Sequence, residues 1–184
     1  MFRPNRVLTS LVLCGALALS TWGATTLVQA ATPPAAALPP DIAKLFDQFV
    51  GEWRAGDLRL EAGGQVVKGT SHVRCEKTAS GMAVQCRLQV SAPGMQIDDM
   101  NLLGWDGESG EVHLFCAGSG GAAHDHAGRF DGTTLTVENR EPRGGKPQLD
   151  SIVFTFNGPR ELHWKSSTTI AGKTLFAGEG VYRR

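Results

Sequence analysis

The residues best able to do chemistry are the two histidines His124 and His126. Side chains two positions apart point the same way on an extended segment, so both imidazoles would share one side of a strand. Imidazole is a common ligand of zinc and copper, and this pair would supply half of such a site. His113 and Cys116 are further candidate ligands, and the sequence leaves open whether either lies near the pair. A solvated loop after the glycine-rich stretch 118–123 is the alternative, and we expect no metal or other cofactor.

The first thirty residues have the pattern of a secretory signal peptide. Arg3 and Arg6 precede an apolar run over 7–19, and small residues follow up to Ala30. The run is too short to span a bilayer. We therefore expect residues 1–30 to be removed, the mature protein to be periplasmic or secreted, and no membrane span.

The charge of the chain excludes some partners. Its 184 residues include 18 basic and 18 acidic side chains, which gives a formal net charge of +0. Binding to nucleic acid or to an anionic membrane surface needs a basic excess or patch, so we expect neither partner. Small molecules remain as partners, and the oligomeric state stays open.

Three cysteines follow the predicted signal peptide, and export would place them in an oxidising compartment. A hairpin that turns at Ser80 and Gly81 would set Cys75 opposite Cys86. We therefore predict a Cys75–Cys86 disulfide and a free Cys116. The alternative is that all three are small buried side chains without a bond.

A short helix precedes the main part of the chain. Residues 31–40 are rich in alanine and proline and predict a flexible lead-in to a domain over 41–184. Asp41 is placed to cap a helix over 42–50, where apolar residues recur at helical spacing, and Gly51 would end it.

After this helix the chain alternates apolar and polar residues, which is typical of strands with one buried face. Glycine turns separate the runs and favour antiparallel pairing between neighbours. About ten such strands usually close on themselves, because closure removes both sheet edges. We therefore predict an all-β fold, a closed antiparallel up-and-down barrel wide enough to hold a small ligand. The predicted strands are 53–60, 66–77, 82–91, 99–105, 111–117, 128–131, 134–140, 149–157, 161–169 and 173–182.

Several short motifs, in this order, carry a family resemblance. Residues 51–53, Gly-Glu-Trp, resemble the Gly-x-Trp motif of lipocalins. Together with 102–106, 128–136 and 180–184, they are similar to a lipocalin-like bacterial family known as domain of unknown function 1579. The resemblance covers most of 41–184 and implies a calycin-type barrel with a helix at one end and no established reaction.

The lipocalin resemblance also implies a structural pair. In lipocalins the motif tryptophan packs with an arginine from the end of the chain and closes one mouth of the barrel. The equivalent pair here would be Trp53 and Arg183, and a guanidinium over an indole is a favourable contact.

Barrels of the nitrobindin type share the ten-strand plan and hold haem through a histidine on a late strand. His163 is in a similar place here, which makes it the candidate haem ligand. Leu162 and Trp164 would lie on one strand face and His163 with Lys165 on the other, which favours an exposed His163.

The repeated apolar strand faces and the lack of a complete catalytic set favour a binding protein over an enzyme, with no catalytic residues assigned. We predict that the barrel interior binds a small hydrophobic ligand. A metal- or haem-dependent enzyme that uses His124 and His126 or His163 is the alternative, and a protein-binding or structural role also stays open. The predicted lining is Leu88, Val90, Met100, Leu102, Phe154, Phe156, Leu162 and Trp164.

Overall fold

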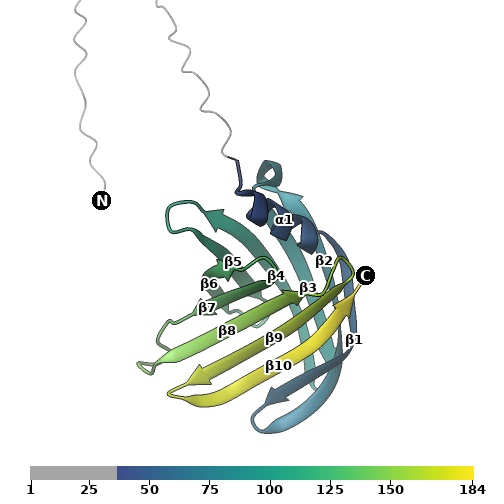
Figure 1. Ribbon diagram of the computed structural model, residues 1–184. Helices are drawn as coiled ribbons and strands as arrows, with labels where there is room; N and C mark the ends of the chain where they lie inside the picture. The colour runs from purple at the N-terminus through teal and green to yellow at the C-terminus, as the bar shows by residue number, and fades with distance from the viewer. Residues whose placement is uncertain (1–36) are drawn as a thin grey trace, which may run out of the picture. The chain divides into compact units, whose positions relative to one another are not determined.

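Ten strands form a closed antiparallel barrel with one α-helix at one end in the computed structural model, which describes residues 37–184 (Figure 1). Each strand pairs with the next along the chain, and β10 pairs with β1. This confirms the predicted all-β up-and-down barrel. The predicted signal peptide, residues 1–30, and most of the lead-in 31–40 lie outside the described residues.

The elements follow one another with short connections. The helix is α1 (Pro40–Phe49), and a short 3-10 turn, η1 (Ala79–Gly81), joins the second and third strands. The strands are β1 (Gly51–Ala62), β2 (Gln65–Thr78), β3 (Ala83–Ala92), β4 (Met95–Asp106), β5 (Glu111–Gly118), β6 (Ala123–Phe130), β7 (Thr134–Asn139), β8 (Gln148–Phe156), β9 (Glu161–Ile170) and β10 (Lys173–Arg183).

Tight two-residue turns connect some of the neighbouring strands. Gly63 and Gly64 have φ of 59° and 81°, and they connect Ala62 of β1 to its partner Gln65 of β2. Two successive left-handed residues make the turn whose twist matches that of a hairpin, and glycine adopts this conformation without steric cost. Tight turns of this kind make consecutive strands neighbours and so produce the up-and-down order.

The helix starts two residues earlier than the predicted range 42–50. Pro40 is its first residue and no side chain caps it, so the prediction that Asp41 is the cap is wrong. Proline suits the first helical position because its missing N–H would have no partner there. No helix within residues 37–184 has the length and apolar character needed to cross a membrane.

Strand β6 is longer than predicted, because it begins at Ala123 and not at Gly128. Residues 118–122 form the turn, in which the Gly118 N–H donates to the Ala122 carbonyl. Pairing with β5 starts directly afterwards, between Ala117 and Ala123. The histidines of this segment therefore lie on a strand, and the solvated-loop alternative is wrong.

The helix closes the end of the barrel at which β1 and β9 begin. Phe49 of α1 packs edge-on against Phe154 and Phe156 of β8, with ring centroids 5.2 and 5.0 Å apart. Ile42, Leu45 and the other buried residues of α1 join the same core. The helix thus covers one end of the barrel with apolar side chains. Within residues 37–184, no α-helix covers the opposite end.

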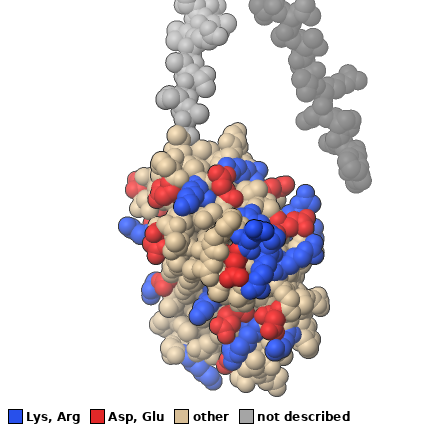
Figure 2. Space-filling model, turned by 45° about the vertical axis from the view of Figure 1, so that its right-hand side comes forward, with Lys and Arg blue, Asp and Glu red and all other residues tan. Residues whose placement is uncertain are grey.

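Charged side chains of both signs lie close together on the outer face of the molecule (Figure 2). Arg87 and Asp98, for example, form an ion pair between β3 and β4 with a shortest N–O distance of 2.6 Å. The face shown in Figure 2 has no large area of one sign.

Candidate functional site

The barrel encloses a cavity of about 320 Å³. Side chains from α1 and from all strands except β7 line it. At the helix end its wall is aromatic and aliphatic, with Phe49, Trp53 and Leu162. A concave, largely apolar cavity inside a barrel is the usual form of a small-molecule site.

Most of the predicted lining residues face this cavity. The five that line it are Leu88, Val90, Phe154, Leu162 and Trp164. Phe156 is buried beside it and packs edge-on against Phe49 and Trp53. The structure thus brings together six of the eight residues on the inner side of the barrel.

The prediction that Met100 and Leu102 face the interior is wrong. Their side chains are 40% and 41% exposed on the outer face of β4. The register explains this, because Leu88 of β3 pairs with Asp99, and paired residues on neighbouring strands share a face. In the middle of β4 the inner face therefore carries Asp99 and Asn101, while the apolar Met100 and Leu102 lie outside.

Two glycines of β10 make room for large side chains. A Cβ added to Gly178 would lie 2.5 Å from the Trp164 ring, and one added to Gly180 would overlap Leu58. Real Cβ atoms do not approach other atoms so closely, so Trp164 lies directly over the β10 backbone. The indole ring of Trp164 therefore packs against the β10 backbone and lines the cavity.

Trp53 closes the helix end of the cavity. It is 1% exposed, and its Nε1–H donates to the Phe49 carbonyl at 2.8 Å. Its cationic partner is Arg184, whose guanidinium carbon lies 4.2 Å from the ring centroid, so the predicted pairing with Arg183 is wrong. Alternation along β10 turns Arg183 to the outside, where it bonds to Glu161 at 2.9 Å.

The predicted disulfide between Cys75 and Cys86 is present, and the two residues pair directly across β2 and β3. Cys86 also lines the cavity. Cys116 has a free thiol that faces the same cavity. Burial, reinforced by nearby carboxylates, raises the pKa of this thiol to about 12, so Cys116 is unsuited to nucleophilic chemistry.

His124 and His126 both line the cavity, with ring centroids 6.2 Å apart. His126 is 3% exposed, and burial lowers its pKa, which keeps the imidazole neutral. Within residues 37–184, no three His, Cys, Asp or Glu side chains are placed to hold a metal ion together. The metal-site alternative therefore lacks a third ligand.

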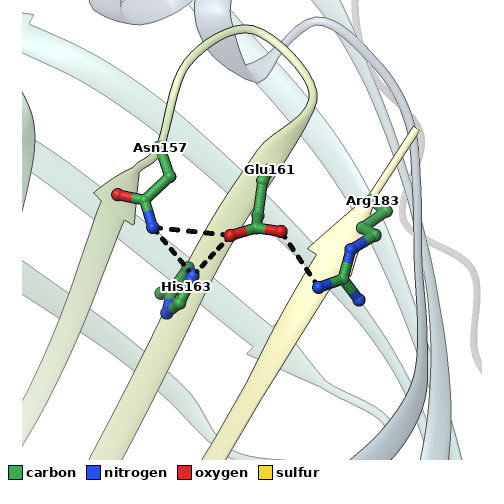
Figure 3. A network of polar contacts seen from close by, with 4 residues as sticks. All are labelled: Asn157, Glu161, His163 and Arg183. Carbon is green, nitrogen blue, oxygen red and sulfur yellow. Dashed lines mark hydrogen bonds and ion pairs between the residues drawn. The ribbon is translucent and has the colours of Figure 1, made fainter.

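His163 faces outward and takes part in a surface network (Figure 3). Its Nε2 lies 2.9 Å from Glu161 Oε1 and 3.0 Å from Asn157 Nδ2. Hydrogen bonds from His163, Asn157 and Arg183 lower the pKa of Glu161. The expected exposed position of His163 is thus confirmed. A haem inside the barrel is out of reach of this side chain, so the alternative of His163 as a haem ligand is wrong.

The sequence analysis missed a polar part of the cavity wall. Asp99 and Asp150 line it, together with His124, His126, Asn101 and Cys116. Burial raises the pKa of Asp99. Asp150 is 8% exposed, and its Oδ2 accepts a hydrogen bond from Gln148, whereas its Oδ1 has no partner.

Comparisons with known proteins support the fold. No family model matches the chain, and no curated protein matches it. Among solved structures, the S-type phycobiliprotein lyase CPES from Guillardia theta is similar, with a TM-score of 0.54 and 16% sequence identity. The match covers 78% of this chain and 92% of that chain. At this identity it shows a calycin-type barrel, and the resemblance to domain of unknown function 1579 stays a prediction.

Proposed function

We propose that this protein binds a small, largely apolar molecule in the interior of its barrel. The observation that carries the proposal is the cavity of about 320 Å³, which is closed at one end by α1 and Trp53 and lined largely by aromatic and aliphatic side chains. The preformed wall needs no rearrangement to receive a ligand, which keeps the entropic cost of binding low.

The apolar part of the wall supplies the driving force. A ligand that buries about 300 Å² of apolar surface gains about 7 kcal/mol from removal of that surface from water, before the costs of association. Phe154, Leu162 and Trp164 offer a flat aromatic and aliphatic surface for such contacts. The phycobiliprotein lyase has a similar barrel, and this likeness extends to the fold alone.

We also propose that the protein works outside the cytoplasm, in the periplasm or after secretion. The Cys75–Cys86 disulfide fits an oxidising compartment. The charge and apolar pattern of residues 1–30 support the same location. Cell fractionation of the full-length protein, with N-terminal sequencing of the mature form, tests this, and a cytoplasmic protein that retains residues 1–30 would contradict it.

The ligand-binding proposal is tested with Nile red, a neutral dye that fluoresces in apolar surroundings. Wild-type protein should bind the dye saturably. Trp164→Lys places a charge in the cavity and should weaken binding at least about ten-fold, because an unpaired charge there loses its hydration. Leu102→Lys makes a similar change on the outer face of β4 and should leave binding unchanged.

The two variants separate the cavity from the outer surface. Equal losses in both, or dye binding that persists in Trp164→Lys, would contradict interior binding. Circular dichroism of both variants shows that the barrel is intact. Native mass spectrometry of freshly purified wild-type protein should then reveal a retained small molecule and its mass.

A further inference from the structure

Two buried polar atoms of cavity-lining side chains have no hydrogen-bond partner within residues 37–184. They are Oδ1 of Asp150 on β8 and Nδ1 of His126 on β6. Both side chains line the cavity and are more than nine-tenths buried. A buried polar atom without a partner costs free energy, so an unfilled pair of this kind indicates what a ligand could supply.

The neighbouring residue on β7 forms no hydrogen bond with either atom. Asn139 of β7 pairs directly with Asp150 and follows Glu138, which pairs with Ala127 beside His126. Its Nδ2 donates to the Asp125 carbonyl at 2.8 Å, and its Oδ1 accepts from the Glu141 N–H at 3.1 Å. Both polar atoms of Asn139 are therefore engaged elsewhere, and Asp150 Oδ1 and His126 Nδ1 keep no partner among the described residues.

The free atoms favour a ligand that donates hydrogen bonds. A carboxylate oxygen such as Asp150 Oδ1 can only accept, and a neutral imidazole has one nitrogen that accepts and one that donates. Asp99 adds a second carboxyl group to the same cavity. We name Asp99, His126 and Asp150 the acceptor wall.

Among the residues that the structure describes, the cavity lining has no lysine or arginine that could pair with an anionic ligand. A carboxylate or phosphate group on a ligand would meet Asp99 and Asp150 without a lysine or arginine, at an electrostatic cost in a site that is partly shielded from water. An amine or a hydroxyl group would instead find acceptors.

Building on the proposed interior binding, we propose that the ligand is amphipathic and that the acceptor wall binds its polar end through hydrogen-bond donors. This polar end is an amine, another N–H group or a hydroxyl, and it is not an anion. The apolar body then lies toward Trp164 and the helix end of the cavity. The acceptor wall thus sets which class of apolar molecule is held.

The experiment compares three probes that each contain an unbranched chain of ten carbons in displacement of Nile red. Decylamine offers donors, decyl methyl ether offers none, and decanoate is an anion. Decylamine should displace the dye at a concentration at least about ten-fold lower than either of the others, as expected for one charge-assisted hydrogen bond. Equal potency of decylamine and the ether, or a preference for decanoate, would overturn the proposal.

Variants assign the preference to the wall. Asp150→Asn keeps the shape of the side chain but removes its charge, and should remove most of the preference for decylamine while Nile red still binds. Asp57→Asn removes a carboxylate that is paired with Lys68 on the surface and should have no effect. A preference that survives in both Asp150→Asn and Asp150→Leu would overturn the role of the acceptor wall.

The outcomes also separate this inference from the proposed function. If the dye and the ether both bind but donors bring no advantage, only the polar recognition fails. If wild-type protein binds neither Nile red nor any probe, interior binding fails and the acceptor wall fails with it.

Discussion

Arg184 is the residue that covers Trp53, because its guanidinium lies 4.2 Å from the indole centroid and also donates to the carbonyls of Val50, Gln48 and Pro159. One side chain thus joins β1, the end of α1 and the loop between β8 and β9. Its neighbour Arg183 makes an exposed ion pair with Glu161.

This arrangement predicts unequal effects for two adjacent arginines. Arg184→Ala should lower the free energy of unfolding by about 1–3 kcal/mol, because it removes a cation–π contact and hydrogen bonds to carbonyl groups. Arg183→Ala should cost less than about 1 kcal/mol, as is usual for exposed ion pairs. Urea unfolding measures both, and a larger effect at Arg183 would contradict the assigned pair.

The disulfide should contribute to stability. Cys75→Ala with Cys86→Ala should lower the free energy of unfolding by about 2–4 kcal/mol, because the bond restricts the unfolded chain. Cys116→Ala, the matched control, leaves the bond intact and should have a smaller effect. Peptide mapping without reduction should show Cys75 linked to Cys86, and a bond that involves Cys116 would contradict the observed register.

Cys116 should resist alkylation in the folded protein. With a pKa of about 12, only about one thiol in ten thousand is ionised at pH 8, and the thiolate is the reactive form. Iodoacetamide should therefore label Cys116 at least about a hundred-fold more slowly in the native protein than in urea. Equal rates in the two states would show that the thiol is exposed or activated.

His126 should make the protein less stable in mild acid. Burial lowers the pKa of His126 in the folded state, so below about pH 6.5 the unfolded chain binds more protons than the folded one, and stability falls as the pH falls. The slope should approach but not exceed about 1.4 kcal/mol per pH unit. His126→Gln should remove this contribution, whereas His113→Gln on the outer face should retain it.

The groups that face His126 define the useful pH range. His124, Asp150, Asp99 and Cys116 line the same cavity. Burial raises the pKa of Asp99, so that carboxyl acts in the opposite direction at lower pH. The difference between wild type and His126→Gln between about pH 5.5 and 8 therefore isolates the histidine, because the other groups are present in both proteins. An unchanged slope in His126→Gln would contradict its buried, neutral state.

The sequence held enough information to correct the error at β4. Leu88 and Val90 were predicted to face inward, and the Pro93–Gly94 turn makes Ala92 pair with Met95. Counting back along the hairpin then sets Leu88 opposite Asp99, so Met100 must face outward. Choosing the more apolar pair between 99 and 102 failed because Asp99 and Asn101 line the interior there. The same counting across β8 and β9 pairs Phe154 with Trp164, as the prediction required.

Other features of the site could not be derived from the sequence. Oδ1 of Asp150 lacks a partner in the described part of the chain because Gln148 donates to the other carboxylate oxygen and Asn139 donates to the Asp125 carbonyl. Side-chain packing determines these partners. Likewise, the one-residue difference between Arg183 and Arg184 depends on which face of β10 turns inward beside Trp53. Periodicity predicts strands and alternation, but the absolute orientation of a strand follows from the register of the closed barrel.

The pairing of β1 with β10 has a consequence for how the chain folds. The other nine strand pairs join neighbours in sequence and can form as hairpins, whereas this seam joins segments from the two ends of the barrel domain. Closing so long a loop is slow, so the seam should form last. Until then β1 and β10 expose unpaired edges, which can add strands from other chains. Aggregation during refolding should therefore begin at these two edges and fall steeply once β10 docks.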